Sequence, residues 1–170
     1  LVDNELFAEA LLQDQKSIVS QLAVMQIQNT MLQSGSLSHP LDGVACSDAP
    51  QGAFPSTDQY IGSFDELRAV PKGHIAPVIE RDGSVRKVPA IICSDQKAYP
   101  ALSIAPFFQL TSATQWRGSI REGSGLFDPE KSLIIDSYPG LEIPLDYDGG
   151  LRISFAKSPD SFYTVSALDI

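Results

Sequence analysis

The sequence has no long apolar run. No stretch approaches the roughly 18–20 consecutive apolar residues that a membrane-crossing helix needs, so we expect no membrane span. No signal-peptide pattern is visible, and the chain begins at Leu1 without a Met. We therefore expect the sequence to be a fragment of a longer protein.

Basic residues are also scarce. The 170 residues include 12 Lys and Arg against 21 Asp and Glu, which gives a net charge of −9. The basic residues are scattered, and Arg86 and Lys87 are their one adjacent pair. Because binding to nucleic acid phosphates needs clustered Lys and Arg, we expect no nucleic acid partner.

Residues that carry common catalytic chemistry are few. His39 and His74 are the two histidines, and we interpret both as loop residues. The stretch EGSGLF lacks the Gly-x-Ser-x-Gly spacing of a nucleophile elbow. Asp146 and Asp148 flank Tyr147, a pattern that fits a turn better than a calcium loop. The sequence therefore predicts a protein that is not an enzyme and has neither a metal site nor a cofactor.

Two cysteines, Cys46 and Cys93, allow at most one disulfide. They have no Cys-x-x-Cys spacing and no nearby His, which argues against a zinc site. We interpret them as two separate buried apolar side chains, with a disulfide as the alternative.

The first 34 residues contain neither Gly nor Pro and are rich in Leu, Ala, Gln, Glu and Met, so they predict one helix that stops at Gly35. Heptad spacing gives this helix a seam. The seam residues predicted to form a trimeric coiled-coil core are Leu11, Gln15, Ile18, Leu22, Met25, Asn29 and Leu32. In this interpretation the amides of Gln15 and Asn29 set the register between copies. The alternative is that the helix packs on the chain's own β-domain.

The remaining sequence predicts a neck followed by a β-domain. Residues 36–59 are rich in Ser, Pro, Gly and Asp, and they exclude a regular helix. Residues 60–170 have turn signals every 8–12 residues or so, and Asp82-Gly83 predicts a hairpin. We therefore predict three parts: a helical stalk at 1–35, a neck at 36–59, and an antiparallel jelly-roll-like β-sandwich at 60–170.

Two sets of residues in the β-domain are candidates for contacts outside the chain. Phe107 and Phe108 point to opposite faces of a predicted strand at 101–111, so Phe108 is a candidate for an intersubunit surface. The closing stretch SFYTVSALDI predicts a final buried strand, and its Phe162 and Tyr163 are candidates for the same surface. Trp116, with Arg117 beside it, is a candidate ligand contact, although a strand Trp is more often part of a core.

A helical stalk, a neck and a β-head that ends on an aromatic strand resemble the trimeric knobs of phage and viral fibres and needles. Their heads are similar to tumour-necrosis-factor or C1q-type jelly rolls. The resemblance implies a homotrimer on the virion or another extracellular surface, with a structural and adhesive role. It also implies a host cell-surface component as partner, in attachment or envelope penetration. The alternatives are a bacterial surface or pilus subunit, and a C1q-like module that binds a small ligand or a glycan.

Overall fold

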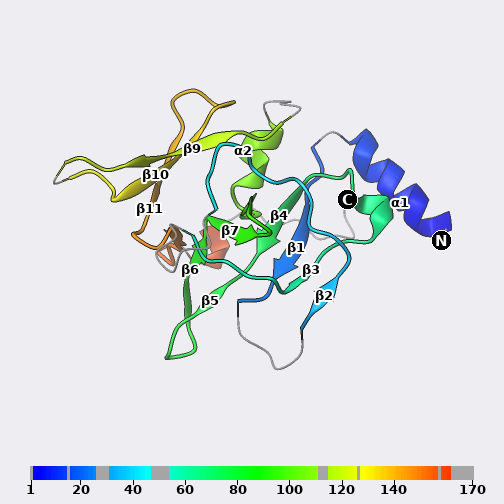
Figure 1. Ribbon diagram of the computed structural model, residues 1–170, viewed down its shortest axis with the longest axis horizontal. Coiled ribbons are helices and arrows are strands. Elements are labelled where there is room, and N and C mark those ends of the chain that lie inside the picture. The colour runs from blue at the N-terminus through cyan, green and yellow to red at the C-terminus, as the bar shows by residue number, and fades with distance from the viewer. Residues whose placement is uncertain are drawn as a thin grey trace.

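The computed structural model describes residues 2–14, 16–25, 31–46, 54–110, 115–125, 127–156 and 158–161. The described strands lie in four small sheets, with a helix at the N-terminal end (Figure 1). The chain is therefore mainly β with an N-terminal α-helix, as the sequence predicts.

The N-terminal helix α1 spans Val2–Gln13, so the prediction of one helix over residues 1–34 is wrong beyond residue 13. A turn follows the helix. In it the Ser17 hydroxyl donates to the Asp14 carboxylate at 2.6 Å, and the Ser17 backbone N–H donates to the Asp14 carbonyl at 2.9 Å. Short polar side chains that bond nearby groups in this way compete with helix formation.

The segment after the turn is extended and contains strand β1 (Val19–Ala23), which pairs in parallel with β4 (Lys72–Ile75). Ile18 and Val19 are β-branched, which favours a strand. Side chains alternate along a strand, and here Gln21 and Ala23 are buried while Ser20 is exposed. Because this stretch is extended, the predicted helical stalk over residues 1–35 is not present.

The amide of Gln21 joins two segments of the same chain. Its Nε2 donates to the Ser38 carbonyl at 3.1 Å, and its Oε1 accepts the Ser38 backbone N–H at 3.0 Å. The predicted register amides, Gln15 and Asn29, lie outside the described residues. The described amide in this stretch thus connects parts of one subunit.

β1 also belongs to a four-stranded mixed sheet of order β2-β3-β1-β4. The new strands are β2 (Gln33–Ser34) and β3 (Tyr60–Ile61). β1 pairs antiparallel with β3, and β2 pairs in parallel with β3. This sheet incorporates residues that the sequence assigned to the stalk into the β-domain.

The other three sheets are antiparallel among their described strands. One sheet has the order β12-β6-β5, with β5 (Val78–Ile79), β6 (Val85–Pro89) and β12 (Gly150–Arg152). A second has the order β11-β10-β9, with β9 (Gly118–Glu122), β10 (Lys131–Ile135) and β11 (Glu142–Leu145). The third is the pair β7 (Ile91–Ser94) and β8 (Lys97–Pro100).

The predicted hairpin at Asp82-Gly83 is confirmed, because it joins the paired strands β5 and β6. Gly83 has a φ of 80°, a left-handed conformation that glycine adopts without steric cost. The backbone N–H of Ser84 donates to the Asp82 carboxylate at 3.0 Å, which completes the turn.

Two short helices lie within the predicted β-domain. The 3-10 helix η1 spans Asp65–Leu67, and helix α2 (Ala105–Gln109) replaces the middle of the strand predicted at 101–111. Pro106 lies in the first turn of α2, where its missing N–H costs nothing and its φ suits a helix. A last 3-10 helix, η2 (Pro159–Ser161), ends the described chain.

The main core gathers buried side chains from the predicted neck and from the β-domain. Leu41, Val44 and Phe54 contribute from the predicted neck. They pack in a cluster that includes Phe108 and Trp116, whose rings stack with centroids 5.4 Å apart. The predicted boundaries at 35 and 59 therefore do not separate independently packed units.

A disulfide joins Cys46 to Cys93 in β7, with Cα atoms 5.6 Å apart and 47 positions apart in sequence. The interpretation of two separate side chains is wrong, and the alternative is the observed state. The bond connects the predicted neck covalently to the centre of the β-domain.

We expect loss of this bond to destabilise the fold by about 4 kcal/mol, because the unfolded chain regains the entropy of a long loop. The test is urea unfolding of the oxidised protein and of a Cys46→Ser, Cys93→Ser double variant. Equal unfolding midpoints would contradict the expectation. Reductant should lower the midpoint of the oxidised protein and leave the double variant unchanged.

Candidate functional site

An open hollow of about 950 Å³ lies among β1, β4, β6, β11, β12 and the turn that leads into α2. We call it the apolar groove. Its lining includes Leu22, Ile75, Val88, Phe107, Ile143 and Leu151. Hollows of this size, mostly apolar with a few polar groups, are typical of binding sites.

The close approach of β4 to the turn before α2 forms one wall of the groove. The Leu102 backbone N–H donates to the His74 carbonyl at 2.9 Å. A Cβ on Gly73 would lie only 2.4 Å from the Leu102 Cα, so this approach requires glycine. Sequence position 73 thus determines how closely the two segments meet.

His74 is an unusual polar residue beside this groove. Side chains alternate along β4, so its ring lies on the face of Lys72 and not on the face of Ile75, which lines the groove. The residue is 2% exposed, and neither ring nitrogen has a hydrogen-bond partner within the described residues. Burial lowers the pKa of His74 to about 4, so the ring is neutral at pH 7. A buried polar group without a partner costs about 1–3 kcal/mol.

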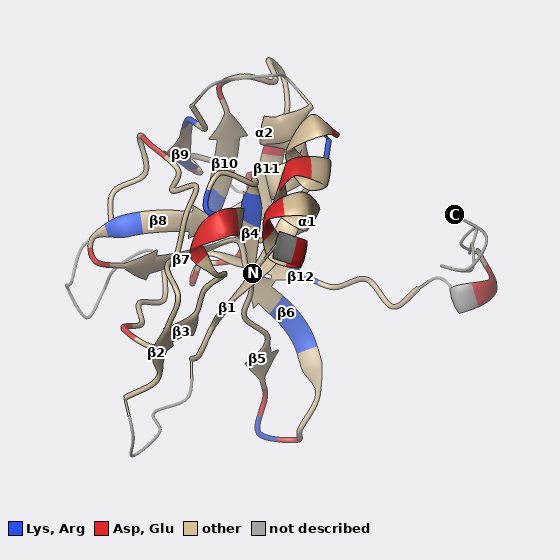
Figure 2. Ribbon diagram, turned by 90° about the vertical axis from the view of Figure 1, so that its right-hand side faces the viewer, with Lys and Arg blue, Asp and Glu red and all other residues tan. Residues whose placement is uncertain are grey.

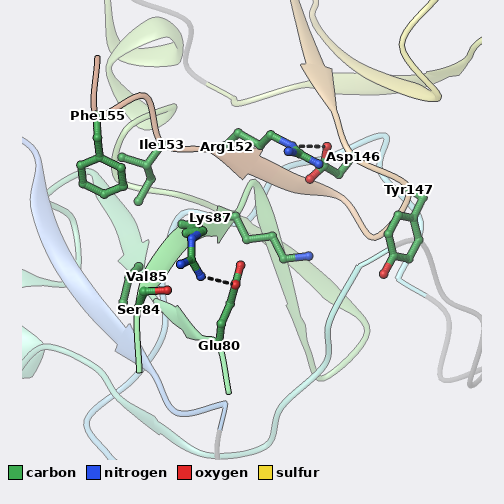
Figure 3. A pocket seen from close by; sticks show the side chains of 10 residues that line it. Glu80, Ser84, Val85, Lys87, Asp146, Tyr147, Arg152, Ile153 and Phe155 are labelled. Atoms are coloured by element: carbon green, nitrogen blue, oxygen red, sulfur yellow. Dashed lines mark hydrogen bonds and ion pairs between the residues drawn. The ribbon is translucent and has the colours of Figure 1, made fainter. Parts of the chain in front are cut away.

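A second hollow of about 550 Å³ adjoins the apolar groove and shares Arg152 and Ile153 with it. We call it the charged pocket. Figure 3 shows Glu80, Lys87, Asp146 and Arg152 around it, with Tyr147 at one side and Phe155 at the other. Strands β6 and β12 supply its cations.

Each cation of the charged pocket lies against a carboxylate. Arg86 pairs with Glu80 at 2.6 Å and with Asp82 at 2.7 Å. Lys87 pairs with Asp148, and its Nζ lies 5.7 Å from the centre of the Tyr147 ring. The hydrogen bond that Lys87 donates to Asp148 raises the pKa of Lys87, and the one that Arg86 donates to Asp82 raises the pKa of Arg86.

The third cation, Arg152, pairs with Asp146 through its Nε at 3.2 Å, and its side chain is 83% exposed. Figure 3 shows this pair on the opposite side of the pocket from Glu80. Because Arg152 also lines the apolar groove, it places an exposed positive charge where the two hollows meet.

A buried ammonium group supports the opposite side of β4. Lys72 is 0% exposed, and its Nζ donates to the Leu67 carbonyl and, at 3.0 Å, to the Val70 carbonyl. Burial lowers the pKa of Lys72 to about 8. Leu67 is the last residue of η1 and Val70 lies just after it, so the ammonium stabilises the end of that helical turn. Lys72 lines neither the groove nor the charged pocket.

The structure places the described members of the predicted stalk seam in different surroundings. Leu11 packs beside Leu67 and Val70, and Ile18 packs against the main core. Leu22 lines the apolar groove, and Met25 packs against a small cluster that contains Ile92. Leu32 is half-buried, and its carbonyl accepts the Tyr60 backbone N–H at 2.8 Å.

The predicted contact residues of the head are mostly internal. Phe108 is 0% exposed, so its predicted place at an intersubunit surface is wrong. Trp116 is 5% exposed and lies between the rings of Phe108 and His39, which makes it a core residue. Arg117 is exposed at the start of β9. Phe162 and Tyr163 lie outside the described residues.

His39 lies in a loop, as predicted, and its pKa is lowered to about 4 by burial and by the charge of Lys72. His74, in contrast, is a strand residue. The groove combines residues that are far apart in sequence, so no local motif marks it. The one available signal is the apolar run IAPVI before the Asp82-Gly83 hairpin, which the sequence assigned to no site.

Comparison with known proteins gives no match: no family model, no curated protein and no solved structure matches this chain. Within the described ranges, no three His, Cys, Asp or Glu residues cluster as a metal site would require. The described helices are all too short or too polar to cross a bilayer. We therefore take the apolar groove and the charged pocket as the candidate functional sites.

Titration of His74 gives a test of its burial. Its pKa is 6.5 in the unfolded chain and about 4 in the folded one, so the unfolded state gains its proton first as the pH falls. The contribution of neutral His74 to the free energy of unfolding is therefore complete above about pH 7. It decreases by about 3 kcal/mol as the pH falls from about 6.5 to about 4. Urea unfolding at several pH values measures this loss. His74→Leu should decrease the loss, and an unchanged pH dependence would contradict the assignment.

Proposed function

We propose that this chain is a non-catalytic structural subunit that assembles with copies of itself outside the cytoplasm, and that the apolar groove is the assembly site. The observation that carries the proposal is the groove itself, which is open and lined mainly by apolar residues. Open apolar surface is costly in water, and a bound polypeptide segment removes that cost.

Exposed apolar side chains outside the groove also support assembly. On α1, Leu6 is 60% exposed and Phe7 is 53% exposed. Ala8 and Leu11 of the same helix pack against the η1 region. A helix that exposes large apolar side chains besides those that it buries is typical of one that has a further partner.

The Cys46–Cys93 disulfide supports a location in an oxidising compartment. Disulfides persist in secreted and surface proteins and on virions, and they are rare in the cytosol. The net charge of −9 keeps such a subunit in solution before it assembles.

The non-catalytic part of the proposal is supported by the electrostatics of the charged pocket. General acid–base catalysis needs a group that titrates near the working pH. Here Arg86 and Lys87 have raised pKa values because each hydrogen bonds to a carboxylate. The pocket is therefore suited to holding charges in place.

The particular assembly that we propose is the one the sequence predicts, a homotrimeric tip of a phage tail needle or fibre that contacts a host cell-surface component. In this form of the proposal the heads hold the trimer, because a coiled coil of residues 1–35 is excluded by β1. A jelly-roll arrangement of the head and a location on the virion belong to the same proposal. The predicted ligand contact at Trp116 does not, because that indole is buried.

Two isoleucines give a matched test of the assembly site. Ile75 lies in the groove and is 44% exposed, whereas Ile79 lies outside it and is 54% exposed. Both are strand residues whose replacement should leave the subunit folded. We expect the wild-type chain to have a mass that is a multiple of 18.4 kDa, and Ile75→Asp to dissociate it at least 100-fold more readily.

Light scattering after size exclusion measures these masses. Ile79→Asp should keep the wild-type mass, because its charge stays in solvent. A wild-type chain of 18.4 kDa at all concentrations, or equal behaviour of the two variants, would overturn the assembly site.

A further inference from the structure

We propose that the apolar groove of one copy holds residues 162–170 of a neighbouring copy, so that the subunits are joined by exchanged C-terminal segments. This inference rests on the proposed function, because it names the occupant of the same groove. Residues 162–170 lie outside the described residues, and their contribution is argued from their sequence.

The groove sets two requirements for its occupant. Its wide apolar lining calls for several apolar side chains in a short length. The exposed guanidinium of Arg152 at the groove's end favours a carboxylate there.

The segment FYTVSALDI meets both requirements. Six of its nine residues are apolar: Phe162, Tyr163, Val165, Ala167, Leu168 and Ile170. Asp169 carries a carboxylate. Alternation of Tyr163, Val165 and Ala167 with Thr164 and Ser166 suits an extended chain with one apolar side. In that conformation nine residues span about 30 Å.

The path of the chain favours a neighbouring copy over the chain's own groove. After β12, every residue between 153 and 161 whose burial the structure describes is exposed, including Phe155 at 73%. Figure 2 shows this trace leaving the strands and ending well away from the rest of the molecule. The described residues after β12 are therefore led away from the groove beside which they begin, toward space that another copy can occupy.

An arrangement of this kind is reciprocal within a closed ring. Each copy gives one segment and receives one, so every groove is filled. The same contact explains why the groove is open in a single chain. Its occupant is covalently part of the next subunit.

The experiment uses two full-length variants. The first, Val165→Asp with Leu168→Asp, has an intact groove and a segment that is too polar to fill one. The second, Ile75→Asp, has an intact segment and an impaired groove. We expect each variant alone to have a mass of 18.4 kDa, and an equimolar mixture to form a one-to-one complex of twice that mass.

A synthetic peptide of residues 158–170 provides a direct binding measurement. It should bind the Val165→Asp, Leu168→Asp chain, and it should bind at least 100-fold more weakly when that chain also carries Ile75→Asp. The same peptide with the two Asp substitutions is the control and should not bind. Circular dichroism checks that all variants remain folded.

The outcomes separate the two proposals. If wild type assembles, Ile75→Asp dissociates it and the segment variant stays assembled, then the groove is the assembly site and the exchanged segment is wrong. If wild type is a monomer and the peptide binds the segment variant, the segment fills its own groove, and both the exchange and the assembly are wrong. If the peptide binds no variant and the mixture does not associate, the exchange is also wrong.

Discussion

The parallel pairing of β1 with β4 is the constraint on which the rest of the structure depends. It places Leu22 opposite Ile75, and both side chains line the apolar groove. It also makes the N-terminal part of the chain a component of the β-domain. If β1 were helical, as its composition suggests, β4 would lose its neighbour and the groove would lose one of its walls. The apolar groove thus exists because residues Val19–Ala23 form a strand instead of the helix that their composition suggests.

Much of the local structure follows from sequence. The mainly β class, the hairpin at Asp82-Gly83 and the start of a helix near residue 2 were all predicted. Each depends on neighbouring residues alone: turn chemistry at Gly83, and helix-forming residues without Gly or Pro in α1. Predictions of this kind succeed because the determining interactions span only a few positions.

The errors have a common physical cause. Residues 18–25 have apolar side chains at spacings that suit both a helix and a strand, and the choice is made by β4, about 50 positions further on. Phe108 and Trp116 are aromatic residues that suit a core or an interface equally well, and only their stacking shows which applies. The groove combines side chains from several elements, so its existence depends on tertiary packing that no local pattern contains.

The parallel pair has a kinetic consequence. Antiparallel strands can be joined by a turn of two residues, but Val19 and Lys72 must meet across a loop of more than fifty positions. The entropy of closing such a loop must be overcome before the pairing contributes any stability, so contacts of this kind form slowly. During that interval the apolar residues of the N-terminal segment lack their strand partner. The Cys46–Cys93 bond, once formed, shortens the loop that must close, because it joins Cys46, which lies between Val19 and Lys72, to Cys93, which follows Lys72. Oxidation is therefore expected to affect the rate at which this chain folds as well as its final stability.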